Sequence, residues 1–251
     1  MVELKQLERY CNELLQIESI SDYCPNGLQV DVGVEQIQRI VTGVTASQAL
    51  LDAAVERCAD LLLVHHGYFW KGEQPALVGI KGRRIGTLYR GNVSLMAYHL
   101  PLDVHKELGN NRMLAQRFGF DAAAPVEPGD GLLWTAELSQ PESIAQITER
   151  IILGLGREPL YLPGGGAEIR RVGWCSGGAE DYINQAAEHG VDAFISGEVS
   201  EPTMHLAREL GVHFFSAGHH ATERFGIQAL GEHLARSFDL EHCFIDLPNP
   251  V

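Results

Sequence analysis

The chain of 251 residues lacks three features that would assign it to a familiar class: a disulfide framework, a targeting segment and a long apolar run. Its five cysteines are odd in number, widely spaced and contain no C-x-x-C, which excludes both a stapled secreted scaffold and a cysteine zinc knuckle. No apolar run approaches the length of a membrane span, and no basic stretch precedes an apolar core at the start. These absences predict a protein of the reducing cytoplasm that does not insert into a membrane.

A basic surface is also missing. The formal net charge is −14, and the lysines and arginines are scattered singly along the chain. Proteins that bind polymeric DNA or RNA normally offer a basic face from which counterions are released, so we exclude a nucleic-acid polymer as the partner. A small anionic ligand remains compatible with this charge if a bound metal offsets the field locally.

The chain contains an internal repeat. RIVTGVTASQALLDAAVERCADLLLVHH (39–66) and RVGWCSGGAEDYINQAAEHGVDAFISGE (171–198) align without a gap, and both are typical of a strand, a turn, an amphipathic helix and a second strand. The identical pairs are Arg39 and Arg171, Ala54 and Ala186, Glu56 and Glu188, and Asp60 and Asp192. This order is a βαβ unit with parallel strands. A further strand follows in each half, at 93–98 and at 212–217.

The repeat predicts an α/β fold made of two related lobes that arose by internal duplication, the first over 1–125 and the second over 126–251. Pro- and Gly-rich segments at 125–131 and 162–168 mark the connecting region. Between them we expect a strand, a helix and a strand that belong to the second lobe. A helix near 221–236 and a strand at 242–248 close the chain, and we expect that they pack back on the first lobe.

Polar clusters follow three of the expected parallel strands, where ligands gather in open α/β sheets. His65 and His66 follow the strand at 61–64. HLPLDVH (99–105) follows the strand at 93–98, and GHHATE (218–223) follows the strand at 212–217. Imidazoles and carboxylates are the usual ligands of zinc, manganese, iron and nickel. The three clusters therefore predict a metal site.

The spacing within these clusters indicates two metals. Adjacent residues of a strand point in opposite directions, so we expect His65 and His66 to serve two ions, or one ion and one substrate, and not one ion together. His219 and Glu223 are spaced i, i+4 at the expected start of a helix and share a face. A glutamate there is able to bridge two cations about 3.5–4 Å apart, the spacing of two-metal hydrolytic sites. His99 is equally compatible with a supporting or a surface role.

Five motifs carry a resemblance to a known family: PNGLQV (25–30), VHHGYFWKG (64–72), HLPLDVHKELGNN (99–111), SGEVSE (196–201) and AGHHATER (217–224). They resemble the short bacterial members of the type 2 homologues of GTP cyclohydrolase I, also called the Ngg-interacting-factor-like family. One departure is Gly67, where many relatives have proline after the paired histidines. The resemblance implies two like α/β lobes with a dinuclear metal centre in the cleft between them, and assembly as a homohexameric ring. It places the metal ligands on His65, His66, Asp103, His219 and Glu223.

Two functions are compatible with such a centre. The first is a metal-dependent hydrolase, like a cyclohydrolase, that acts on a nucleotide or a related small heterocycle. The second is a metal-binding scaffold or regulatory protein without catalytic activity. The ligand set does not distinguish iron, manganese, zinc and nickel.

Residues outside the ligand set are candidates for other roles. Glu198 occupies the place in the second repeat that His66 occupies in the first, and is a candidate proton shuttle or a carboxylate that orients a ligand histidine. Tyr68, Trp70 and Lys71 could stack on a base and bind a phosphate, or pack against another subunit.

Overall fold

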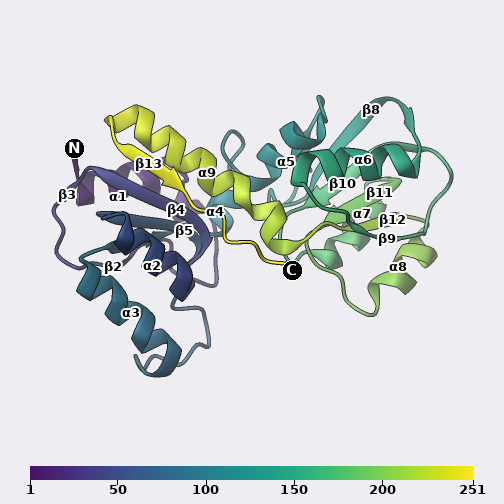
Figure 1. Cartoon of the computed structure of the whole chain (residues 1–251). Helices are drawn as coiled ribbons and strands as arrows, with labels where there is room; N and C mark the ends of the chain where they lie inside the picture. The colour runs from purple at the N-terminus through teal and green to yellow at the C-terminus, as the bar shows by residue number, and fades with distance from the viewer. The chain divides into compact units, whose positions relative to one another are not determined.

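The computed structural model describes residues 1–251 as two compact units, the first made of Met1–Leu108 with Gly226–Leu247, and the second of Gly109–Phe225 with Pro248–Val251. These units divide the chain differently from the lobes expected at 1–125 and 126–251. The segment after residue 108 lies in the second unit, and residues 226–247 lie in the first. Each unit is an α/β structure, which confirms the predicted fold class (Figure 1).

The first unit contains a five-stranded sheet in the order β13-β4-β5-β6-β2. Its strands are β2 (Gly27–Val30), β4 (Arg39–Thr45), β5 (Leu61–His66), β6 (Ser94–Ala97) and β13 (Glu241–Phe244). The neighbours from β13 to β6 are parallel, and β2 is antiparallel to β6. A small separate pair joins β1 (Val2–Glu3) to β3 (Gln36–Ile37).

Helices cover both faces of this sheet, so its central strand is apolar throughout. Leu61 and Leu63 of β5 pack in one core with α1 (Leu4–Leu14) and with α9 (His219–Phe238), while Leu62 and Val64 pack in another with α2 (Gln48–Glu56) and α3 (Gly79–Gly91). Alternate residues of a strand point to opposite faces, which is why LLLV is buried without a break. The short elements η1 (Ile17–Ser19) and α4 (Leu100–Asp103) complete the unit.

The second unit contains a six-stranded sheet in the order β7-β8-β10-β11-β12-β9. Its strands are β7 (Ala124–Pro125), β8 (Trp134–Glu142), β9 (Leu160–Leu162), β10 (Ile169–Cys175), β11 (Ala193–Ser196) and β12 (His213–Ser216). β10, β11 and β12 are parallel, and the outer strands are antiparallel to their neighbours.

Helices pack on both faces of the second sheet as well. One core joins α5 (Asn110–Phe118) and α6 (Ile144–Leu155) to the sheet, and another joins α7 (Ile183–Glu188) and α8 (Thr203–Leu210), which η2 (Glu180–Tyr182) precedes. Ser143 and Gln146 form a capping box that fixes the start of α6. Helix α9 begins in this unit at His219 and continues into the first unit from Gly226.

The repeat seen in the sequence is reproduced by the pairing of the strands. Ile40 pairs with Leu61 in the first sheet, and the aligned Val172 pairs with Ala193 in the second. Asp60 accepts the backbone N–H groups of residues 38 and 39 at 2.8 Å, and Asp192 accepts those of residues 170 and 171 at 2.7 and 2.9 Å. The alignment therefore predicts the backbone frame of both units correctly.

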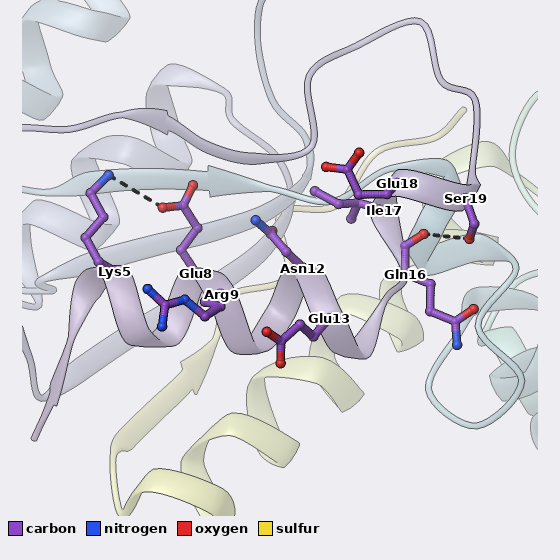
Figure 2. A pocket seen from close by; sticks show the side chains of 9 residues that line it. All are labelled: Lys5, Glu8, Arg9, Asn12, Glu13, Gln16, Ile17, Glu18 and Ser19. Atoms are coloured by element: carbon purple, nitrogen blue, oxygen red, sulfur yellow. Dashed lines mark hydrogen bonds and ion pairs between the residues drawn. The ribbon is translucent and has the colours of Figure 1, made fainter.

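An open pocket of about 650 Å³ runs along α1 and the turn after it (Figure 2). Its lining mixes cations such as Lys5 and Arg9 with carboxylates such as Glu13 and Glu18. None of the histidines of the predicted site lines it. No helix of the chain combines the length and the apolar character needed to cross a bilayer.

Candidate metal centre

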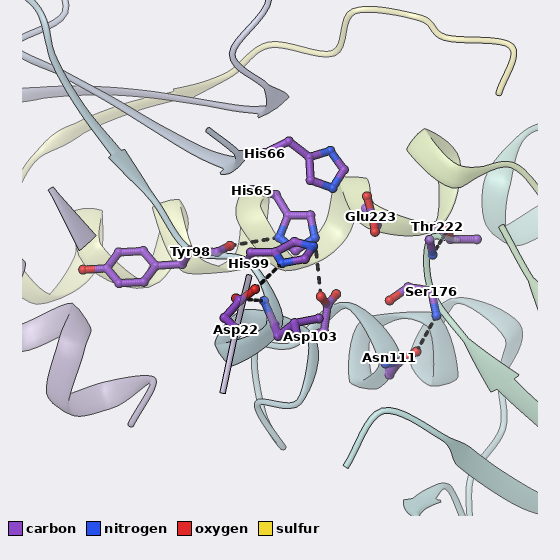
Figure 3. Close-up of polar contacts among 12 residues, drawn as sticks. Asp22, His65, His66, Tyr98, His99, Asp103, Asn111, Ser176, Thr222 and Glu223 are labelled. Atoms are coloured by element: carbon purple, nitrogen blue, oxygen red, sulfur yellow. Dashed lines mark hydrogen bonds and ion pairs between the residues drawn. The ribbon is translucent and has the colours of Figure 1, made fainter. Parts of the chain in front are cut away.

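The carboxyl ends of β5 and β6 bring three histidines of the first unit together (Figure 3). His65 and His66 end β5, and His99 follows β6 just before α4, which ends at Asp103. The ligand atoms of the three imidazoles all lie within 4.8 Å of one another. We call these three residues the imidazole group.

His65 is fully buried, and both of its ring nitrogens face an oxygen. Its Nδ1 donates a hydrogen bond to the backbone carbonyl of Tyr98 at 2.9 Å, and its Nε2 lies 3.5 Å from Oδ2 of Asp103. In a neutral imidazole, a nitrogen that donates to a carbonyl leaves the lone pair on the other nitrogen. This arrangement orients a metal-ligating imidazole in many metalloproteins. The contacts therefore fit the predicted ligand roles of His65 and Asp103.

The rings of His65 and His66 lie together, with their centroids 4.6 Å apart. Our expectation that the two side chains diverge is wrong. Alternation along a strand fixes only the direction of the Cα–Cβ bonds, and side-chain torsions at the last position of the strand are able to bring a ring back. Nδ1 of His66 is hydrogen-bonded to Oγ1 of Thr45 at 3.2 Å on the neighbouring strand β4.

His99 is held by a buried carboxylate that the sequence did not reveal. Its Nδ1 lies 3.0 Å from Oδ1 of Asp22, which also accepts a hydrogen bond from the N–H of Tyr23 at 2.7 Å. The other carboxylate oxygen of Asp22, Oδ2, accepts hydrogen bonds from the side-chain amide of Asn26 at 2.9 Å and from the N–H of Leu100 at 3.0 Å. Burial alone would raise the pKa of Asp22, but the hydrogen bonds from His99 and Asn26 and the charge of His99 hold that pKa well below its ordinary value. Asp22 is therefore a carboxylate that fixes the orientation of the His99 ring.

Cys24 lies near Asp22 and His99, and these three residues form a second cluster of potential ligands. Burial, with the neighbouring carboxylate of Asp22, raises the pKa of the Cys24 thiol to about 12. Because a thiolate and not a thiol binds metals, this cluster is a poor metal site.

The second unit positions His219 and Glu223 as the helical spacing predicts. Nε2 of His219 lies 3.1 Å from Oε2 of Glu223, and its Nδ1 donates to Oε1 of Glu198 at 2.6 Å. Burial, the largest single effect, would lower the pKa of His219, but the hydrogen bonds and charges of Glu223 and Glu198 together raise it to about 9. Glu198 thus contacts the ring nitrogen of a predicted ligand, which is the geometry of a carboxylate that orients it.

The turn after β10 leaves room for the Glu223 carboxylate. Gly177 has φ of +69°, and a Cβ at this position would collide with Oε1 of Glu223. Its N–H donates to Oγ1 of Thr222 at 3.0 Å, which connects the turn to the first turn of α9. Glycine is therefore required here by both the backbone angle and the close approach.

The three predicted substrate-binding residues lie in different surroundings. Tyr68 is buried, and its hydroxyl donates to the carbonyl of Ala46 at 2.7 Å, so its ring is not exposed to a ligand. Trp70 is half-buried beside the imidazole group, 5.9 Å from the ring of His66. Lys71 is exposed.

Comparison with known proteins agrees with the motifs. Residues 2–250 match the family described as Duf34/NIF3 (NGG1p interacting factor 3). The chain is 55% identical to a GTP cyclohydrolase 1 type 2 homolog of Pseudomonas aeruginosa over 100% of this chain and 99% of the relative, and 53% identical to one of Escherichia coli over 98% of each.

A solved structure described as "protein ybgI, unknown function" superposes with a TM-score of 0.95 at 51% identity and covers 100% of both chains. The family match spans nearly the whole chain and the sequence identities exceed one half over full length. The chain therefore belongs to the Duf34/NIF3 family.

Proposed function

We propose that the protein binds two divalent cations through His65, His66, Asp103, His219 and Glu223, and that it is a metal-dependent hydrolase of a nucleotide or a related small heterocycle. The observation that supports this proposal is the orientation of the imidazoles. In each of the three ligand histidines, Nδ1 is engaged by an oxygen, from the Tyr98 carbonyl, the Thr45 hydroxyl or the Glu198 carboxylate.

The residues present fit such ions by their chemistry. Nε2 of each histidine would be the atom that binds a cation, and imidazole with carboxylate suits iron, manganese, zinc or nickel. When bound, such ions lower the pKa of water and polarise the bond that is attacked. The chain itself supplies the positioning, because Glu198 holds the ring of His219 while the carbonyl of Tyr98 holds that of His65.

Protonation links the second unit to cation binding. With a pKa of about 9, His219 carries two ring protons at neutral pH before a cation arrives. Nε2 of His219 would have to lose its proton to hold a cation, and the Glu198 carboxylate would keep the proton on Nδ1. Glu198 is accordingly proposed as an orienting carboxylate, and its role as a proton shuttle is the weaker proposal.

The test begins with the purified protein stripped of metal by a chelator and reloaded with one cation at a time. Elemental analysis is expected to give two ions per chain in the wild type and fewer in Glu223→Gln. Glu232→Gln, an exposed change on the same helix, is the matched control and should retain both ions. A wild-type stoichiometry of zero would contradict the metal centre.

A screen against GTP and other nucleotides tests the hydrolase. Turnover that requires the cation, and that Glu223→Gln abolishes, supports the enzyme. Tight cation binding without turnover supports the second candidate, a non-catalytic scaffold or regulatory protein. The name of the relatives, GTP cyclohydrolase 1 type 2 homolog, motivates the choice of GTP as the first substrate.

We also propose that the chain assembles with copies of itself as a homohexameric ring in the cytoplasm. Leu77, Val78 and Ile80 are large apolar side chains that are mostly exposed on the first unit, as in surfaces that bind other chains. Light scattering coupled to size-exclusion chromatography measures the mass directly, and a monomer would contradict this assembly.

A further inference from the structure

Two aromatic side chains of the first unit, Tyr23 and Trp70, border the imidazole group without joining an apolar core. Tyr23 is 54% exposed and Trp70 is half-buried, and neither belongs to the two clusters that form the cores of this unit. Their ring centroids lie 5.8 Å apart. The ring of His99 makes T-shaped contacts with both, its centroid lying 5.0 Å from that of Trp70 and 5.1 Å from that of Tyr23.

The loop that carries Trp70 is built to hold it in place. Oε2 of Glu73 accepts the backbone N–H groups of Phe69 at 2.8 Å and of Trp70 at 3.2 Å. Lys81 lies 3.1 Å from the same carboxylate and 4.7 Å from the centroid of the Phe69 ring. Phe69 has φ of +66°, a left-handed backbone that costs energy for a bulky residue. Such strain persists only where the surroundings enforce it, as in preorganised binding loops.

The loop that carries Tyr23 is joined to the first one. The N–H of Lys71 donates to the carbonyl of Tyr23 at 2.7 Å, and the N–H of Tyr23 donates to Asp22. The two aromatic side chains are therefore presented by one hydrogen-bonded frame, and binding a ligand on them would order little additional chain.

Asp22 also sets the hydrogen-bonding character of His99. An ionised carboxylate only accepts hydrogen bonds, so Nδ1 of His99 donates to Asp22 and the orientation of the ring is fixed beside the two aromatic side chains. A planar aromatic ring matches Tyr23 and Trp70, because every base offers a π-face for stacking on an aromatic side chain.

We propose that Tyr23 and Trp70, beside His99, form a subsite on which a planar heteroaromatic ring of the purine type stacks. This inference rests on the proposed function, because it identifies the part of the substrate that the site would recognise. Neither Tyr23 nor Trp70 is one of the five proposed metal ligands, and both side chains are partly exposed. The subsite therefore requires no metal to bind the ring.

The test measures binding of guanosine to the full chain in the presence of a chelator. Of the three tryptophans, Trp134 and Trp174 are only 2% and 0% exposed, so fluorescence quenching by the nucleoside reports on Trp70. Ribose 5-phosphate, which has no aromatic ring, is the matched ligand control. Calorimetry gives the affinity of variants that lack Trp70.

Stacking of a base on an aromatic side chain is worth about 1–3 kcal/mol, so we expect Trp70→Ala and Tyr23→Ala each to weaken guanosine binding about tenfold. Trp70→Phe should retain most of the affinity. Tyr89→Ala, which removes a tyrosine that is 59% exposed on α3, should leave the affinity unchanged. Ribose 5-phosphate should not quench the fluorescence.

Equal affinity of the wild type and Trp70→Ala for guanosine would overturn the proposal, as would the absence of saturable binding. A fall in oligomer mass in both aromatic variants, with guanosine affinity unchanged, would assign these residues to a subunit contact instead. Because the assay contains no metal, its result is separate from the metal stoichiometry and the turnover that test the proposed function.

Discussion

Asp60 and Asp192 offer equivalent perturbations in the two repeats. Each carboxylate accepts two backbone N–H groups at the start of a strand, and each residue also connects three strands through its own backbone. The N–H of Asp60 donates to the carbonyl of Arg39 at 3.0 Å, and its carbonyl accepts from Ser94 at 3.0 Å. Replacing the aspartate by alanine therefore leaves two strand-end donors without their acceptor.

The expected cost follows from these two hydrogen bonds. A hydrogen bond to a charged group contributes about 1.5–3 kcal/mol to stability. Because both aspartates are half-buried, water is able to hydrogen-bond the exposed N–H groups in the alanine variants and offsets part of this loss. We expect Asp60→Ala and Asp192→Ala each to cost about 2–4 kcal/mol. A factor of ten in an equilibrium constant corresponds to about 1.4 kcal/mol, so the equilibrium constant for local opening of the strand should rise about thirtyfold or more.

Hydrogen exchange read by mass spectrometry is the suitable assay, because a chain with two compact units need not unfold in one step. Asp60→Ala should accelerate exchange in peptides that contain β4 and β5, and Asp192→Ala in those that contain β10 and β11. Asp52→Ala, on the exposed side of α2, is the control and should change neither. Unchanged exchange in both aspartate variants would refute the reasoning that these carboxylates fix the strand ends.

Three further predictions concern the site and the thiols. Glu198→Gln should weaken cation binding about tenfold or more, because carboxylates that orient metal-ligating histidines contribute that much to metal affinity. Glu201→Gln, a change at an exposed residue nearby, should leave the affinity unchanged, and competition with a chromogenic chelator measures both variants. Asp22→Asn should destabilise the first unit near neutral pH. Because the pKa of Asp22 is lowered in the folded protein, its contribution is present above the unfolded pKa of about 3.8 and is lost as the pH falls below it, so thermal shift curves of variant and wild type should converge in acid. A thiol reagent at pH 8 should modify the exposed Cys58 and Cys243 first, while Cys11, whose pKa burial raises to about 12, should react only after unfolding; early modification of Cys11 would contradict this order.

The backbone frame was predictable from the sequence because periodicity and repeated turns determine it. The alignment of 39–66 with 171–198 predicted the pairing of strands, and the i, i+4 spacing predicted that His219 and Glu223 meet. Both depend on local geometry, in which residue spacing fixes direction.

The side-chain arrangement of the first unit was not predictable in the same way. His65 and His66 approach each other through side-chain torsions, which alternation along a strand does not determine. Asp22 lies 77 positions before His99 in a loop without periodicity, so no spacing rule joins them. A single carboxylate within a short polar turn has no sequence pattern that predicts a histidine partner, and only the folded structure shows the contact between Asp22 and His99.

The two sheets share the same pairing of strands, and His66 of the first repeat corresponds to Glu198 of the second. One βαβ frame therefore presents an imidazole at this position in the first unit and a carboxylate in the second. A backbone pattern shared by two parts of one chain does not carry the same side-chain chemistry with it, so each copy has to be interpreted from its own residues.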